Sequence, residues 1–129
     1  MGPAELIDAA RALLGEFTLS SEYFRAGNVA SALVSKKGNL YTGICIEVAC
    51  GIGFCAEHAA IAELLKNRET EIEMIVAVSE AGVLPPCGRC RELMFQIDHS
   101  NADTAVVMSA DATITLGELL PHRFLETGT

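Results

Sequence analysis

The sequence predicts an α/β fold with one mixed β-sheet and helices packed on its faces. Apolar residues recur at helical spacing in several segments, and short apolar runs of strand length lie between them. The expected order is helix, two strands, helix, strand, helix, two strands and a short helix. Such alternation is typical of a sheet covered by helices. A chain of 129 residues suits one domain, so we expect a single domain over residues 1–129.

The first half of the chain supplies one helix and two strands. Residues 3–17 have apolar side chains close to helical spacing, with a proline in the first turn. Two apolar runs, 29–34 and 40–46, surround the segment 36–39, whose Gly and Asn suit a tight hairpin turn. Residues 49–54 contain two glycines and are expected to form a loop that leads into the next helix.

The second half alternates more regularly. Residues 55–68 have a strong helical pattern, and the continuous apolar run 72–78 predicts a central strand buried on both faces. Residues 80–86 are expected to be a loop because two consecutive prolines end any preceding element. A second strong helix follows at 87–97. Two further strands and a short helix complete the chain, at 105–108, 112–115 and 117–120.

The charge of the chain bears on its partners. Nine Lys and Arg residues face seventeen Asp and Glu residues, which gives a net charge of −8. A protein that grips a nucleic-acid backbone needs a clustered basic surface, and the basic residues here form only small groups. We therefore expect no nucleic-acid polymer as a partner. A neutral or singly cationic small molecule suits the negative field better.

The apolar segments and the cysteines bear on location. Charges or glycines interrupt every apolar segment before it reaches the length of a membrane span, so no membrane association is expected. The N-terminal residues carry acids and no basic region, unlike a secretion signal. Five cysteines, an odd number, suggest free or metal-bound thiols in a reducing compartment. We expect a cytoplasmic protein.

Two cysteine-bearing segments carry the chemistry, Cys55-Ala-Glu57-His58 and Pro86-Cys87-Gly-Arg-Cys90. Their three thiolates can bind zinc and leave its fourth position open, which is typical of a catalytic site. Cys55 and Cys87 are expected at helix N-termini, where the helix dipole favours a thiolate. Glu57 should lie beside the ion without binding it, and a carboxylate there can transfer protons.

These segments resemble the small tetrameric cytidine deaminases and the related blasticidin S deaminases. The similarity extends to Val29-Ala-Ser-Ala32, Thr42-Gly43, Glu47 and Glu118-Leu-Leu-Pro121, and so spans nearly the whole chain. It implies a three-layer αβα sandwich with a mixed five-stranded sheet, zinc as cofactor and a homotetramer. It also implies a hydrolase that releases ammonia from ring position 4 of a small cytosine-type substrate, with Glu57 as proton shuttle.

The resemblance also implies which residues surround the substrate and the metal. Substrate contacts are expected from Glu47, Cys45, Ala56 and Phe124, and support of the zinc thiolates from Arg89 and His58. The family usually has Asn-x-Glu before the zinc helix, and this pair holds the ribose hydroxyl. Cys45 and Glu47 occupy those positions here, so the amide is missing. Phe124 resembles the C-terminal aromatic residue that closes the site of a neighbouring subunit.

Two further departures concern the metal and the base. Family members usually have Arg directly after Cys-Ala-Glu, where this chain has His58, and Arg89 is a candidate to offset the thiolate charge instead. The family also tends to have an aromatic residue where Gly27 stands. The loss of that wall would leave room for cytosine compounds with a bulkier group on the exocyclic nitrogen, a hypothesis that depends on Gly27 alone.

Several alternatives stay open at this stage. A structural zinc or redox module would use the same cysteines with a fourth ligand, such as His58 or Cys50, and would not need the carboxylate of Glu57. A deaminase of a base in RNA or of a free purine is a second alternative. Within the cytosine class, cytidine, deoxycytidine, a modified cytosine nucleoside and a blasticidin-like antibiotic all remain candidates.

Overall fold

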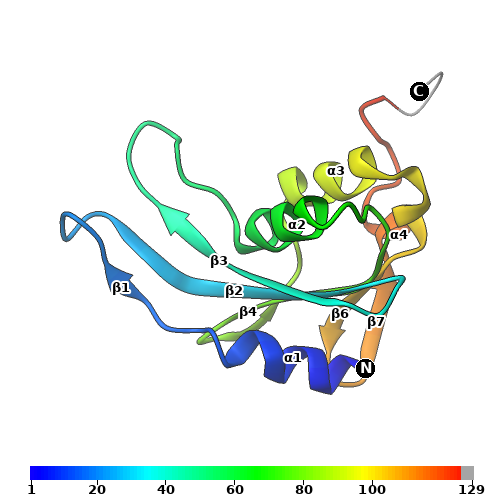
Figure 1. The fold of residues 1–129 in the computed structure, drawn as a ribbon, viewed down its shortest axis with the longest axis horizontal. Helices are drawn as coiled ribbons and strands as arrows, with labels where there is room; N and C mark the ends of the chain where they lie inside the picture. Colours follow the sequence, from blue (N-terminus) through cyan, green and yellow to red (C-terminus); the bar gives the residue numbers. More distant parts are fainter. Residues whose placement is uncertain (126–129) are drawn as a thin grey trace.

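The computed structural model describes residues 1–125 and shows three layers (Figure 1). The sheet forms the middle layer, α1 covers one face, and α2 and α3 cover the other. The helices are α1 (Pro3–Arg11), α2 (Ala56–Lys66), α3 (Gly88–Ile97) and α4 (Leu116–Leu119), with a 3₁₀ helix at His99–Asp103. Within the described part of the chain, no helix is long and apolar enough to span a membrane.

Over residues 1–125 the sheet contains seven strands, so the expectation of five was wrong in number. The strands are β1 (Phe17–Thr18), β2 (Arg25–Ser35), β3 (Leu40–Glu47), β4 (Ile72–Ser79), β5 (Gly82–Leu84), β6 (Ala105–Ser109) and β7 (Ala112–Thr115). The five expected strands pair in the order β3-β2-β4-β6-β7, with only β4 and β6 parallel. The two additional strands, β1 and β5, have two and three residues, which is too short for a recognisable alternation.

The N-terminal helix is shorter than its apolar pattern predicted. It ends at Arg11, and the chain then turns so that the backbone N–H of Gly15 donates to the carbonyl of Gly27 at 2.9 Å. The following residues pair with β2 as β1. Pairing with the sheet thus replaces the last expected helical turns. The other expected element that changed is the loop 80–86, which contains β5.

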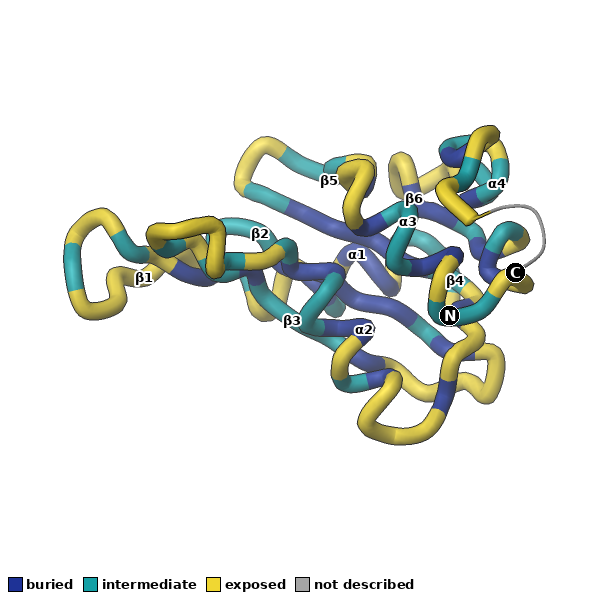
Figure 2. Tube along the Cα trace, turned by 90° about the horizontal axis from the view of Figure 1, so that it is seen from above, coloured by how far each residue is buried: buried dark blue, intermediate teal, exposed yellow. Residues whose placement is uncertain are grey.

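Strand β4 is buried on both faces, as its apolar run predicted. Ile75 packs into the core beneath α2 and α3, whereas Val76 and Val78 pack into the core beneath α1. Figure 2 shows buried residues concentrated in the middle of the molecule and exposed residues in the loops at its periphery. The sheet is therefore held between two apolar layers.

Strand β2 contains a bulge that Gly27 makes possible. Its pairing with β3 shifts register between Ala26 and Ala30. Gly27 has φ +85°, and a Cβ there would lie 2.2 Å from the carbonyl oxygen of Gly15. Only glycine satisfies both conditions without strain. The bulge changes the direction in which the next side chains of β2 point.

A buried carboxylate joins the β2–β3 hairpin to the end of α2. Glu69 is 7% exposed and accepts hydrogen bonds from the Tyr41 hydroxyl and, at 2.9 Å, from the Asn39 side-chain amide. The side chains of Ser35, Tyr41 and Asn39 hold the pKa of Glu69 below its usual range. The ionised form is thus the one that the fold stabilises.

This carboxylate predicts an acid-sensitive component of stability. The component is complete above the ordinary glutamate pKa of about 4.3 and is lost as the pH falls through the lower pKa of folded Glu69. We expect Glu69→Gln to lower the free energy of unfolding at neutral pH and to flatten its fall in this acid range, measured by urea unfolding. The control is Glu71→Gln at an exposed neighbouring position. An equally steep fall in Glu69→Gln would contradict the prediction.

Candidate active site

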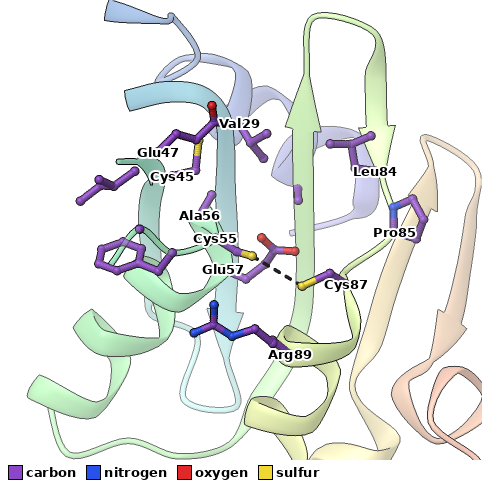
Figure 3. A pocket seen from close by; sticks show the side chains of 14 residues that line it. Val29, Cys45, Glu47, Cys55, Ala56, Glu57, Leu84, Pro85, Cys87 and Arg89 are labelled. Atoms are coloured by element: carbon purple, nitrogen blue, oxygen red, sulfur yellow. Dashed lines mark hydrogen bonds between the residues drawn. The ribbon is translucent and has the colours of Figure 1, made fainter. Parts of the chain in front are cut away.

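Two helices begin side by side at the site, and a cysteine precedes each of them. Cys55 is the N-cap of α2 and Cys87 the N-cap of α3, which confirms their predicted positions. Neither side chain is used for capping, so both thiols are free to face each other. Their sulfur atoms are 3.5 Å apart (Figure 3). The sulfur of Cys90 lies 3.5 Å from that of Cys87.

The spacing of these sulfur atoms suits a zinc ion. In a tetrahedral site with Zn–S bonds of about 2.3 Å, neighbouring sulfurs are about 3.8 Å apart. The observed separations are only slightly shorter. Cys55, His58 and Cys90 also place ligand atoms within 4.8 Å of one another, so the described residues offer a fourth candidate ligand. The donor set of thiols and one imidazole is the type that zinc prefers.

The thiols differ in how readily they ionise. Burial, followed by the charge of Glu57, raises the pKa of Cys90, and burial also raises the pKa of Cys55. Burial opposes ionisation of Cys87 as well, but hydrogen bonds to the backbone of Cys90 and to the thiol of Cys55 outweigh it and lower the pKa of Cys87. Three thiolates so close together require a cation, which a divalent metal supplies.

His58 lies against the thiols on the first turn of α2. Its Nδ1 is 3.5 Å from the sulfur of Cys90. Burial, and then the charge of Arg89, lower the pKa of His58, so the ring is neutral at neutral pH. A neutral imidazole can either donate its N–H to a thiolate or bind a metal through a ring nitrogen. The geometry brings both of the predicted supporting residues, His58 and Arg89, to the metal-binding region.

Glu57 is buried at the bottom of the site. Its side chain is 5% exposed, and burial raises its pKa, although hydrogen bonds to its own backbone N–H and to Cys90 act in the opposite direction. Its carboxylate points toward the thiols of Cys55 and Cys87 (Figure 3). A carboxyl group whose pKa is raised toward neutrality is suited to accept a proton and to return it.

A cavity of about 340 Å³ opens onto these groups, within the size range of small-molecule sites. The expected contacts Cys45, Glu47 and Ala56 line it together with Glu57 and Arg89. The other lining residues come from β2 to β5, the loop before α2 and the start of α3; they are Val29, Ile46, Gly53, Phe54, Cys55, Ala77, Leu84, Pro85 and Cys87.

Two residues expected at the cavity, Phe124 and Gly27, do not line it. Phe124 is 77% exposed and does not line it; its backbone N–H donates to Glu92 at 3.0 Å. Gly27 lines a separate hollow, so its lack of a side chain does not enlarge the cavity. The glycine is explained by the bulge in β2. An aromatic residue that the sequence reasoning missed, Phe54, does line the cavity.

The sequence reasoning also missed Asn28. Its side-chain amide donates to Oε1 of Glu47 at 2.9 Å, and its Oδ1 accepts from the Cys45 thiol at 2.7 Å. Asn28 is on β2, whereas the other two residues are on β3. The only available signal was its position directly after a glycine in a strand, which suggests a bulge.

Comparison with known proteins agrees with this geometry. The family model described as "Cytidine and deoxycytidylate deaminase zinc-binding region" matches residues 9–108. The chain belongs to this family. It is 34% identical over 102 residues to a cytidine deaminase of Halalkalibacterium halodurans, covering 74% of this chain and 76% of that protein. It is 29% identical over 110 residues to a blasticidin-S deaminase of Bacillus cereus, covering 75% and 76%.

The fold comparison agrees as well. A crystal structure of cytidine deaminase from Burkholderia pseudomallei superimposes with a TM-score of 0.76 at 31% identity, covering 96% of this chain and all of that one. The α/β sandwich predicted from the resemblance is therefore confirmed. The family assignment also makes the chain a zinc-binding deaminase, a hydrolase that acts on C–N bonds of cytosine-type compounds.

Zinc could be held by the three thiols of Cys55, Cys87 and Cys90 alone, or by thiols together with His58. These two ligand sets predict different zinc contents for single variants. We expect Cys87→Ala to reduce bound zinc from about one ion per chain to a small fraction, because only two thiols remain. We expect His58 to act as a hydrogen-bond donor to Cys90 and not as a ligand, so His58→Ala should keep its zinc. The measurement is metal content after dialysis against a weak chelator. Exposed Cys50→Ala is the control. Zinc loss in His58→Ala as complete as in Cys87→Ala would make His58 a ligand and would contradict the prediction.

Proposed function

We propose that the chain deaminates a cytosine nucleoside, cytidine or deoxycytidine, with Cys55, Cys87 and Cys90 holding the zinc ion and Glu57 moving the protons. The observation that carries this proposal is the buried Glu57 carboxyl, which lines a cavity beside the thiols of Cys55 and Cys87, with the buried Cys90 thiol directly behind them. A structural zinc module would have no use for a buried carboxyl there, since burying one costs free energy.

The charges around the cavity favour a nucleoside over a nucleotide. Glu47 and Glu57 line it, whereas Arg89 is the only basic residue among the lining residues of the described chain. Arg89 also lies near the thiols, where its charge acts on His58. A phosphate group normally requires several donors or cations. A neutral sugar needs only hydrogen-bond acceptors, which carboxylates provide.

The residues can perform hydrolysis in a simple order. When bound, zinc would lower the pKa of a coordinated water so that a nucleophile forms near neutral pH. Glu57 accepts a proton from the attacking water and donates it to the ring nitrogen at position 3, which makes the neighbouring carbon more electrophilic. After the addition, Glu57 takes the proton of the hydroxyl group now on that carbon and passes it to the exocyclic amine, which leaves as ammonia as the carbonyl forms. Its raised pKa assists both donations.

A blasticidin-like compound is the second candidate substrate. The blasticidin-S deaminase of Bacillus cereus is similar to this chain over three quarters of its length. The net charge of −8 suits a neutral or singly cationic substrate of this kind. An N4-substituted cytosine remains a variant of the same reaction, although Gly27 no longer supports it, because that residue lies outside the cavity.

The assembly is part of the proposal. We infer a homotetramer in the cytoplasm, in which Phe124 of one subunit closes the cavity of another. Glu92 anchors the backbone of Phe124 while the ring is 77% exposed, and an exposed aromatic ring held by its backbone is suited to a neighbouring subunit. Each chain would form one domain.

Glu57 provides the decisive test of the reaction. Ammonia release is measured with zinc-replete protein on cytidine, deoxycytidine, blasticidin S and adenosine, and release of the substituted amine on an N4-substituted cytidine. We expect turnover of at least one cytosine compound and none of adenosine. Glu57→Gln should lose about 10²–10⁴-fold in turnover, because the amide keeps the shape but cannot shuttle protons. Zinc content is the control and should remain unchanged. Near-normal turnover in Glu57→Gln would refute the assigned role.

Phe124 tests the assembly. We expect Phe124→Ala to raise KM for the substrate by about tenfold, because a ring that covers the cavity loses its apolar contact. Exposed Tyr23→Ala is the matched control for loss of an aromatic side chain. Sedimentation measures the mass in the same preparations. A monomeric wild type, or an unchanged KM in Phe124→Ala, would rule out the proposed role.

A further inference from the structure

A chain of hydrogen bonds connects β2 to two residues of β3 that line the cavity, while Asn28 itself lines the separate hollow beside Gly27. The thiol of Cys45 donates to Oδ1 of Asn28, and Nδ2 of Asn28 donates to Oε1 of Glu47. We propose that Asn28 is the positioning residue for Glu47: from the neighbouring strand, it holds the carboxylate that the family resemblance assigns to a hydroxyl group of the substrate. This inference rests on the proposed function and adds a residue that acts on the substrate only through Glu47.

The orientation of the Asn28 amide follows from its partners. Glu47 can only accept hydrogen bonds when ionised, so the NH₂ group of Asn28 must face it. Cys45 is 5% exposed and its thiol can donate, so the carbonyl oxygen of Asn28 must face Cys45. Reversing the amide would place two acceptors together. The buried Cys45 thus fixes the amide, and the amide fixes the carboxylate.

The bulge in β2 makes this arrangement possible. Gly27 adopts φ +85°, and the register between β2 and β3 shifts between Ala26 and Ala30. Without the bulge, strict alternation would govern which face Asn28 occupies. With it, the Asn28 side chain reaches Cys45 and Glu47 on the adjacent strand. The amide that the sequence lacks at position 45 is therefore supplied from another strand, beside the same carboxylate.

The remaining acceptor capacity of Glu47 is what a substrate can use. Oε1 accepts from Asn28, and Oε2 lies 3.4 Å from Nη2 of Arg25, which also pairs with Glu16 at 3.4 Å. A carboxylate has about four acceptor positions, so two such partners leave others available. Glu47 lines the cavity, and these free positions can accept a hydroxyl hydrogen. Cytosine compounds that carry sugar hydroxyls should therefore bind better than those that lack them.

The test compares two substrates that differ only in sugar hydroxyls. Cytidine and 2′,3′-dideoxycytidine are assayed with wild type and Asn28→Ala, both zinc-replete. We expect the ratio of kcat/KM values, cytidine over dideoxycytidine, to fall roughly tenfold in Asn28→Ala, as the loss of one hydrogen bond to a charged group implies. The change should appear in KM for cytidine, because Asn28 does not contact the reacting atoms.

Rescue separates positioning from a purely structural role. The double variant Asn28→Ala/Cys45→Asn returns an amide to the neighbourhood of Glu47 from β3, and we expect it to recover most of the ratio. Asn67→Ala, which removes an amide that bonds only to the end of α2, is the matched control and should leave the ratio unchanged. An equal loss on both substrates, or an unchanged ratio in Asn28→Ala, would overturn the inference.

A binding measurement keeps this test independent of turnover. Calorimetry with uridine and 2′,3′-dideoxyuridine, the two deamination products, should show the same roughly tenfold fall in preference for Asn28→Ala. If wild type released no ammonia from any cytosine compound, the proposed function would fail, and the uridine ratio would still decide the role of Asn28. Equal affinity of wild type for the two products would refute the hydroxyl subsite itself.

Discussion

The close approach of two helix N-termini is the constraint on which the site depends. Cys55 and Cys87 cap α2 and α3, and their sulfur atoms are 3.5 Å apart although the residues are far apart in sequence. This requires α2 to lie close against β3. Gly43 permits it, because a Cβ there would come within 2.6 Å of the backbone nitrogen of Ala60 and 2.8 Å of the carbonyl oxygen of Ala56. A larger residue would push α2, and Cys55 with it, away from β3.

The same packing explains the electrostatics. It buries Glu57 on the first turn of α2, next to thiols that must ionise in order to bind zinc. Without a cation, burial raises the pKa of Glu57, and burial together with the charge of Glu57 raises the pKa of Cys90. We propose that a divalent ion reverses this balance for the thiols, which would then bind it as thiolates. In the proposed mechanism Glu57 is left to exchange its proton during turnover. Metal binding and proton transfer are thus consequences of one geometry.

The sequence was sufficient for the features that local patterns encode. The long strands, the helix starts at Cys55 and Cys87 and the burial of β4 follow from apolar periodicity and from the flanking Gly and Pro residues. Strands β1 and β5 are too short to have a periodicity of their own. They form because the backbone N–H and C=O groups of a neighbouring strand, β2 or β4, are available to pair with them. The environment of Gly27 could not be predicted from the sequence for a related reason. It depends on Gly15, which only the folded chain brings near.

Asn28 illustrates the same limit within the site. A comparison position by position shows an amide missing at Cys45, and it suggests that the sugar-binding half of the site has been lost. In the folded chain the amide of Asn28 hydrogen-bonds to both Cys45 and Glu47. The exchange is coherent, because a small thiol at position 45 leaves space for the Asn28 side chain and also supplies the donor that orients it. Sequence comparison counts Cys45 as the loss of an amide beside Glu47. In the folded chain that amide comes instead from Asn28 on the adjacent strand β2, next to the bulge that Gly27 makes possible.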